Sequence, residues 1–277
     1  MNLGGAMSYA FPGEGALDYF PCRYGTSRLL FRGPRRSLER PFIAVLGGTE
    51  TYGKYVPDPF ADLVEDELGM SVVNLGCMNA GPDVFLHDPG ILDIVNQSEA
   101  TVLQLVGAQN ATNRYYAVHP RRNDRFLHAT PLLQSMFREV DFTEFNFTRH
   151  MLQALQAVSP DRFEVLAEEL RSTWVLRIRD LLSRISGRKV VLWMADQPPA
   201  RPGSRADLRL EPLLVDSEMV GTIRRSADDY VESICAHEGL EGKSFSPLEC
   251  LAAAGLPGPL AHRQTSGLLS ASLKRFV

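Results

Sequence analysis

Cysteine is scarce in this 277-residue sequence, and the four cysteines do not form a metal-binding or disulfide pattern. Cys22, Cys77, Cys235 and Cys250 are far apart, with no C-x-x-C pair and no Cys/His spacing typical of zinc sites. We therefore expect reduced, mostly buried thiols, no metal and no cofactor.

Long hydrophobic runs are also missing. The densest, Val190–Ala195, has the length of a strand, whereas a membrane-spanning helix needs about 20 apolar residues. The first residues, Met1–Asp18, have neither the basic start nor the apolar stretch of a signal peptide. These absences predict a cytoplasmic protein without a membrane span.

The chain has no excess of positive charge, since 29 Lys and Arg stand against 33 Asp and Glu, a net charge of −4. This balance argues against a general nucleic-acid binder. Hydrophobic residues at 44% and charged residues at 22% are typical of a globular domain. The expected partners are a small molecule or glycan, a protein, or a second copy of the chain.

Four apolar runs of strand length each end in a loop, which is typical of buried parallel strands. They are Phe42–Leu46, Met70–Leu75, Ala100–Val106 and Lys189–Met194. An amphipathic helix over Pro59–Leu68 separates the first two. The pattern predicts an α/β fold, a flavodoxin-like three-layer sandwich with a mostly parallel sheet.

The remaining segments predict how the chain is organised around this sheet. We expect an N-terminal leader over residues 1–40 that packs on an α/β domain over 41–277, with a helical insertion at about 111–158. A long helix follows from Ser159, its N-cap, and Pro160, its first residue, to Ile185. Later we expect a short strand at Pro212–Val215 and helices at Ser217–Ala236 and Leu268–Phe276.

In an open parallel sheet, ligands bind outside the carboxyl ends of the strands. The residues there are Gly47–Gly53, Asn74–Gly81 and Gly107–Asn110, and His262 lies near the end of the chain. Their order resembles the SGNH hydrolases, also called GDSL esterases and lipases. The resemblance implies an SGNH-like fold.

The same resemblance implies site residues. It places Thr49 at the nucleophile, His262 at the base, and Gly76 with Gln109 or Asn110 at the oxyanion. A second resemblance, at Phe42–Tyr55 and Leu256–His262, is to an uncharacterised family of alphaproteobacterial proteins and implies no activity.

The chain departs from the SGNH pattern at three positions. Gly48 replaces an aspartate, Thr49 adds a methyl group that crowds attack, and Pro259 replaces the acid that orients the histidine. Loss of the orienting acid costs about 10⁴ in rate in a serine protease. Candidate substitutes at neighbouring strand ends are Glu50, Asp83 and Asp196.

Aromatic and basic residues near these loops are candidate ligand contacts. Tyr52 and Tyr115 could stack on a sugar ring, and Arg122 and Arg205 could bind an anion. We expect the basic runs around these arginines to flank one crevice mouth.

Two functions remain open. The chain is predicted to be an SGNH-like hydrolase or group transferase, of the esterase or acyltransferase kind with a non-standard triad, acting on an acylated or sugar-containing ligand. The alternative is a catalytically degenerate SGNH-like module that binds a glycan or a protein. Each residue also has a purely structural interpretation. Thr49 could cap a helix or hydrogen-bond a turn, the loop glycines could serve positive φ or close backbone approach, and His262 could be a surface or capping histidine.

Overall fold

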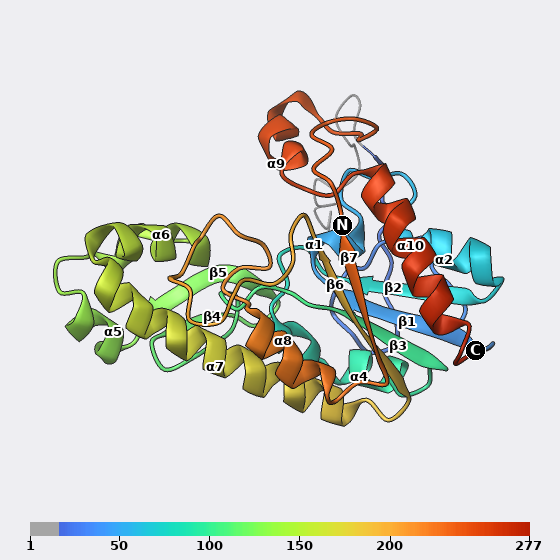
Figure 1. The fold of residues 1–277 in the computed structure, drawn as a ribbon, viewed down its shortest axis with the longest axis horizontal. Helices are drawn as coiled ribbons and strands as arrows, with labels where there is room; N and C mark the ends of the chain where they lie inside the picture. Colours follow the sequence, from blue (N-terminus) through green and yellow to red (C-terminus); the bar gives the residue numbers. More distant parts are fainter. Residues whose placement is uncertain (1–16) are drawn as a thin grey trace, which may run out of the picture.

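A five-stranded, fully parallel sheet lies at the centre of the protein, in a computed structural model that describes residues 17–277 (Figure 1). Its strand order is β2-β1-β3-β6-β7. The strands are β1 (Phe42–Gly47), β2 (Ser71–Gly76), β3 (Ala100–Gln104), β6 (Arg188–Ala195) and β7 (Asp229–Ile234). The predicted α/β fold with a mostly parallel sheet is confirmed.

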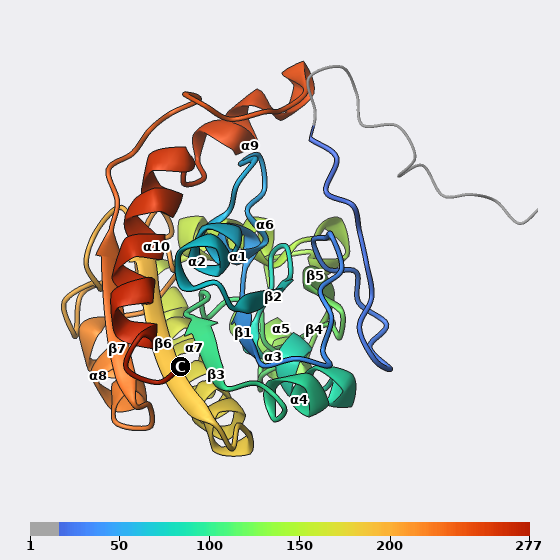
Figure 2. The same ribbon diagram turned by 90° about the vertical axis from the view of Figure 1, so that its right-hand side faces the viewer.

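Helices cover both faces of the sheet, which makes three layers (Figure 2). One face carries α2 (Phe60–Leu68) and α10 (Pro259–Leu273), whose Phe60, Val64 and Leu269 pack with strand residues in one apolar cluster. The helices of the other face are α3 (Pro82–Leu86), α4 (Pro89–Val95), α7 (Pro160–Arg184) and α8 (Ser217–Arg224). The short α1 (Thr49–Tyr52) follows β1 directly.

The long helix α7 begins as the sequence predicts. The Ser159 hydroxyl accepts a hydrogen bond from the Arg162 N–H, and Pro160 occupies the first helical position. On its buried side, the Trp174 indole N–H donates to the Val106 carbonyl oxygen at 2.7 Å. This bond fixes the helix to the loop after β3.

Three predictions about the last third of the chain are wrong. Residues 229–234 form edge strand β7 instead of continuing a helix, and Pro212–Val215 is not a strand. Strand β7 lies at the edge of the sheet with β6 as its strand neighbour, and its residues range from buried to exposed, so its sequence lacks a continuous apolar run. Helix α10 begins at Pro259, nine residues before the predicted start, so His262 lies inside it.

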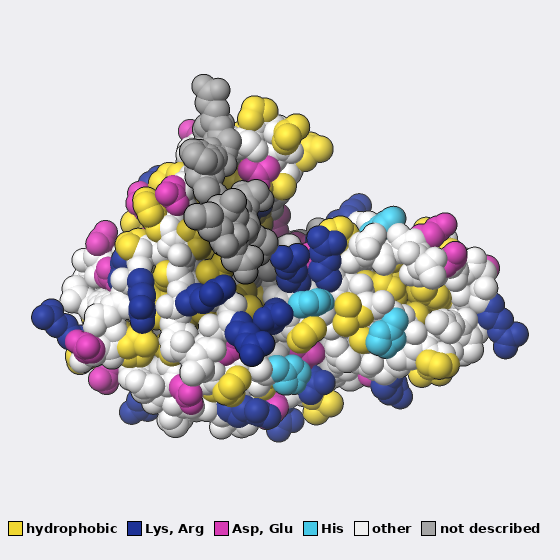
Figure 3. Space-filling view, turned by 180° about the vertical axis from the view of Figure 1, so that it is seen from behind, with side chains coloured by type: hydrophobic (Ala, Val, Ile, Leu, Met, Phe, Trp, Pro, Cys, Tyr) yellow, Lys and Arg dark blue, Asp and Glu magenta, His cyan; other side chains and the backbone are white. Residues whose placement is uncertain are grey.

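The insertion forms an arm beside the sheet (Figure 1). It contains the antiparallel hairpin of β4 (Tyr116–His119) and β5 (Arg122–Ala129), which the sequence analysis missed, then α5 (Pro131–Met136), the 3₁₀ turn η1 (Phe142–Glu144) and α6 (Thr148–Val158). Lys and Arg side chains gather on the face where this arm meets the body (Figure 3).

Residues 17–40 of the predicted leader pack on the domain. Tyr24 and Phe31 are buried in the main core, and Arg32 donates to the Gly53 carbonyl oxygen at 2.6 Å. Residues 1–16 lie outside the described part of the chain. Within residues 17–277, no helix is long and apolar enough to cross a membrane.

Candidate functional site

A cavity of about 650 Å³ opens at the carboxyl ends of the parallel strands, and we call it the crevice. The loops after β1, β2, β3, β6 and β7 line it together with the segment that carries η2 (Pro247–Glu249) and α9 (Cys250–Ala254). Of the predicted site residues, it brings together Thr49, Glu50, Gln109, Asn110 and Asp196.

Thr49 begins α1, and the next loop occupies its hydroxyl group. The Thr49 Oγ1 accepts a hydrogen bond from the Asn79 N–H at 2.9 Å. The same hydroxyl group donates to the Asn79 Oδ1 at 3.4 Å. An amide oxygen is not a useful base, so this arrangement does not activate Thr49 as a nucleophile.

His262 does not line the crevice, and its prediction as the base is wrong. The side chain is 1% exposed, stacks on Phe60 with ring centroids 5.8 Å apart, and accepts the Phe60 N–H at Nδ1 over 3.0 Å. A neutral imidazole that accepts a hydrogen bond at Nδ1 carries its proton on Nε2. Neither ring nitrogen can then accept a proton from the Thr49 hydroxyl group. Burial lowers the pKa of His262 to about 3, with Arg32 and Lys243 contributing in the same direction.

The predicted oxyanion donors are mostly committed elsewhere. The Gly76 N–H donates to the Asn74 Oδ1 at 2.9 Å, which contradicts the oxyanion role. The Asn110 Nδ2 donates to the Asn79 carbonyl oxygen at 3.0 Å, and its Oδ1 accepts from Thr148 at 2.7 Å. The buried Gln109 Oε1 has no hydrogen-bond partner among the described residues, but an amide oxygen only accepts, so this atom cannot stabilise an oxyanion.

Gln104, at the end of β3, organises the floor of the crevice. Its Oε1 accepts the Gly48 N–H at 2.7 Å and the Thr51 hydroxyl at 2.9 Å, and its Nε2 donates to Glu50 at 3.3 Å. Burial raises the pKa of the Glu50 carboxyl, and the nearby charge of Glu211 raises it further.

The other candidate acids differ in their surroundings. Asp83 is buried away from the crevice, pairs with Arg177 at 3.0 Å and accepts the Thr112 N–H at 2.9 Å, so its prediction as an orienting acid is wrong. Asp196 is exposed at the crevice wall. The His262 ring that it was expected to orient does not line the crevice.

The predicted ligand contacts are not at the crevice. Tyr52 and Tyr115 are buried in packing contacts, Arg122 is on the hairpin of the arm, and Arg205 lines a second cavity. The two basic runs therefore do not flank one mouth. The Tyr52 ring packs against the ring of Tyr19, with the two ring centroids 5.3 Å apart.

Several crevice residues escaped the sequence analysis. Arg149 of α6 forms an ion pair with Glu211 and donates to the Leu208 carbonyl oxygen at 2.8 Å. His237 follows β7, and its place after a strand end would have indicated it had that strand been predicted. Across residues 17–277, no cluster of His, Cys, Asp and Glu has the arrangement of a metal site.

A protein-family model described as "Domain of unknown function (DUF6473)" matches residues 7–277. The chain belongs to this family. A search of curated proteins gave no match for this DUF6473 chain.

Solved structures similar to the DUF6473 chain include a lipase from a goat rumen metagenome, at 13% identity, 84% coverage of this chain, 97% coverage of that chain and a TM-score of 0.45. A family two carbohydrate esterase from Clostridium thermocellum, in complex with cellohexaose, is 13% identical. The match covers 89% of this chain and 67% of that chain, with a TM-score of 0.43. A lipase/acylhydrolase from Enterococcus faecalis is 12% identical. The match covers 85% of this chain and 96% of that chain, with a TM-score of 0.40.

Proposed function

We propose that the crevice is a binding site for a sugar-containing or acylated ligand and that it lacks the acyl-transfer machinery of an SGNH hydrolase. The observation that carries this proposal is the Phe60 N–H donating to the His262 Nδ1. It fixes the histidine as a neutral core residue, so that no base reaches Thr49 from α10.

The lining of the crevice suits a polar ligand with an apolar part. Glu50, Gln109 and Asp196 present carboxylate and amide groups that can bind hydroxyl groups. Met78 and Leu251 supply apolar surface at the same cavity, where an acyl group could pack. Gln109 is half-buried in the lining, where its side-chain amide can hydrogen-bond a ligand hydroxyl.

Calorimetric titration with neutral oligosaccharides and their acetylated forms tests this proposal. We expect saturable binding, weakened about tenfold by Gln109→Leu, because the substitution removes an amide hydrogen-bond partner that contributes about 1–1.5 kcal/mol. Gln134→Leu, on α5 of the arm, is the matched control and should bind as the wild type does. No saturable binding, or equal binding by the Gln109 variant, would overturn the proposal.

An ester-hydrolysis assay separates binding from catalysis. With p-nitrophenyl acetate, we expect the wild type and Thr49→Val to give the same rate as buffer. A wild-type rate that Thr49→Val removes would instead establish Thr49 as a nucleophile and restore the hydrolase interpretation.

A further inference from the structure

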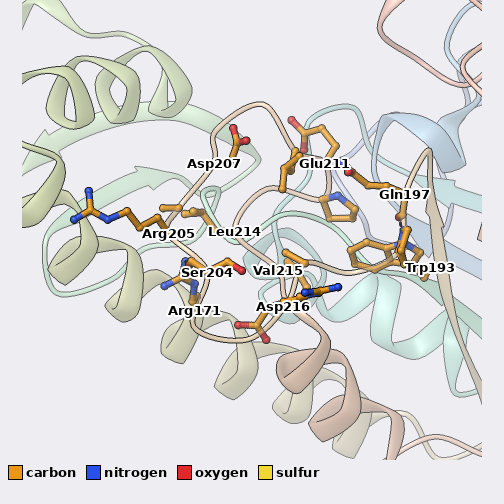
Figure 4. A pocket seen from close by; sticks show the side chains of 16 residues that line it. Arg171, Trp193, Gln197, Ser204, Arg205, Asp207, Glu211, Leu214, Val215 and Asp216 are labelled. Carbon is orange, nitrogen blue, oxygen red and sulfur yellow. Dashed lines mark hydrogen bonds between the residues drawn. The ribbon is translucent and has the colours of Figure 1, made fainter.

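A second cavity, of about 310 Å³, lies between α7 and the loop at 196–216 (Figure 4). We call it the α7 cavity. Arg171 of α7 lines one side and Trp193 of β6 the other, and the buried Leu214 and Val215 of the loop lie between them. It shares Glu211 and Pro212 with the crevice and is otherwise lined by different residues.

Arg171 is only partly satisfied by the protein. Its side chain is 16% exposed, and its contacts with Glu164 at 3.9 Å and Glu168 at 3.6 Å are long. One further donor reaches the Ser204 carbonyl oxygen at 3.5 Å. The Nε is buried and has no hydrogen-bond partner among residues 17–277, although buried guanidinium donors are normally paired.

The carboxylates of the α7 cavity are already partnered. Asp207 pairs with Arg209 at 2.7 Å, and Glu211 pairs with Arg149. Asp216 accepts the N–H groups of Glu218 and Met219 at the start of α8. Arg209 and Arg149 thus neutralise Asp207 and Glu211, whereas Asp216, bound only by backbone N–H groups, keeps its negative charge.

Arg201 and Arg205 also line the cavity, and the Arg205 guanidinium points away from it (Figure 4). Arg201 is exposed and forms no ion pair within the described residues. Arg205 contacts Asp161 at 3.2 Å, but both side chains are more than three-quarters exposed, so this pair contributes little. The cavity thus combines a buried, under-satisfied guanidinium with a free one at its mouth.

We propose that the α7 cavity binds an oxyanion, a phosphate, sulfate or carboxylate group. Guanidinium groups bind such anions through two parallel hydrogen bonds. Arg171 holds the group from inside, and Arg201 closes over it from the mouth. The site does not require a ligand in the crevice.

Titration with inorganic phosphate, sulfate and acetate, followed by calorimetry at low ionic strength, tests the proposal. We expect saturable binding of at least one anion and about a tenfold loss of affinity in Arg201→Ala, because a charge-assisted hydrogen bond contributes 1.5–3 kcal/mol. Arg121→Ala, an exposed arginine on the hairpin of the arm, is the control and should bind as the wild type does. The order of affinity among the three anions distinguishes a phosphate or sulfate site from a carboxylate site.

Arg171→Gln provides a second measurement, with circular dichroism to confirm the native fold. We expect binding to fall further in the double variant Arg171→Gln with Arg201→Ala. Absence of saturable binding for all three anions, or equal affinity in wild type and Arg201→Ala, would overturn the proposal. Loss of anion binding with intact oligosaccharide binding separates this site from the crevice.

Discussion

His262 stabilises the fold in its neutral form. Its ring stacks on Phe60 and accepts the Phe60 N–H, which joins α10 to α2 on one face of the sheet. A protonated ring would lose that acceptor and place a charge in the apolar layer. The same contacts that remove His262 from catalysis make it a pH-dependent element of stability.

We predict that the wild type loses unfolding free energy as pH falls from about 6.5 toward 3. The folded-state pKa of His262 is lowered to about 3, so its contribution is present above the unfolded-state pKa and is lost as pH falls toward the folded one. The slope from this residue is at most about 1.4 kcal/mol per pH unit. Urea unfolding of wild type and His262→Asn, which keeps an acceptor but does not titrate, measures it; parallel pH profiles would contradict this assignment.

Gly76 is required by packing. A Cβ there would lie 2.4 Å from the Tyr52 backbone nitrogen and 2.8 Å from the Thr51 carbonyl carbon. We predict that Gly76→Ala destabilises the protein by roughly 1–3 kcal/mol, the usual cost of overpacking. Gly221→Ala, in α8 with no atom within 4 Å of the new Cβ, should instead stabilise it by about 0.5–1 kcal/mol. If the two substitutions shift the thermal unfolding midpoint in the same direction, this distinction is refuted.

Sequence reasoning located part of the crevice because strand ends can be predicted. Thr49 and Gln109 directly follow apolar runs, and parallel strands bring their ends together. The predicted roles of Gly76 and His262 failed because each is already hydrogen-bonded in the folded chain, Gly76 to Asn74 and His262 to Phe60. No spacing along the chain reveals that a glycine N–H or a histidine nitrogen is already occupied.

At the scale of the element, burial decided which strands could be predicted. In β1 every residue is buried, because sheet neighbours and helices cover all sides, so the sequence is a continuous apolar run. In β7 only part of each face is covered, and Asp229 and Glu232 remain among its residues. An edge strand of this kind resembles an amphipathic helix in sequence.

A buried ammonium group cross-links the segment at 236–258, which lies over the crevice. Lys243 Nζ donates to the carbonyl oxygens of Gly239 at 2.6 Å, Ala253 at 2.7 Å and Leu256. Burial lowers the pKa of this group. Leu248 and Leu251 are 99% and 91% exposed, so apolar packing adds little at these positions.

We predict that Lys243→Met loosens this segment locally, since three carbonyl oxygens lose their shared donor. Hydrogen exchange should accelerate within residues 239–256 and remain unchanged in β6. Lys274→Met, which removes an exposed contact with Glu67 at 3.0 Å, is the control and should leave the segment unaffected. Unchanged exchange in both variants would show that other contacts hold the segment.

At the scale of the whole molecule, the arm and the sheet share one core. A single apolar cluster contains Leu103 and Trp193 of the sheet together with Phe126 and Leu133 of the arm. Asn123 of β5 reinforces the junction, because its Oδ1 accepts the Gly81 N–H at 3.0 Å. The insertion therefore has no separate core of its own in the described chain.

We predict one cooperative unfolding transition. Far-ultraviolet circular dichroism and tryptophan fluorescence, which follows Trp174 and Trp193, should give coincident urea curves because both report the same core. An early transition limited to the arm, detected by proteolysis within residues 116–158, would show that the arm unfolds independently.

The wall between the two cavities has a consequence for energetics. Glu211 and Pro212 line both spaces, and Glu211 also raises the pKa of Glu50 and pairs with Arg149. An occupant of either cavity that displaces this dipeptide changes affinity at the other, and thermodynamic reciprocity makes the factor identical in both directions. Saturating one cavity while titrating the other therefore measures how rigid the shared wall is, without any substitution in the chain.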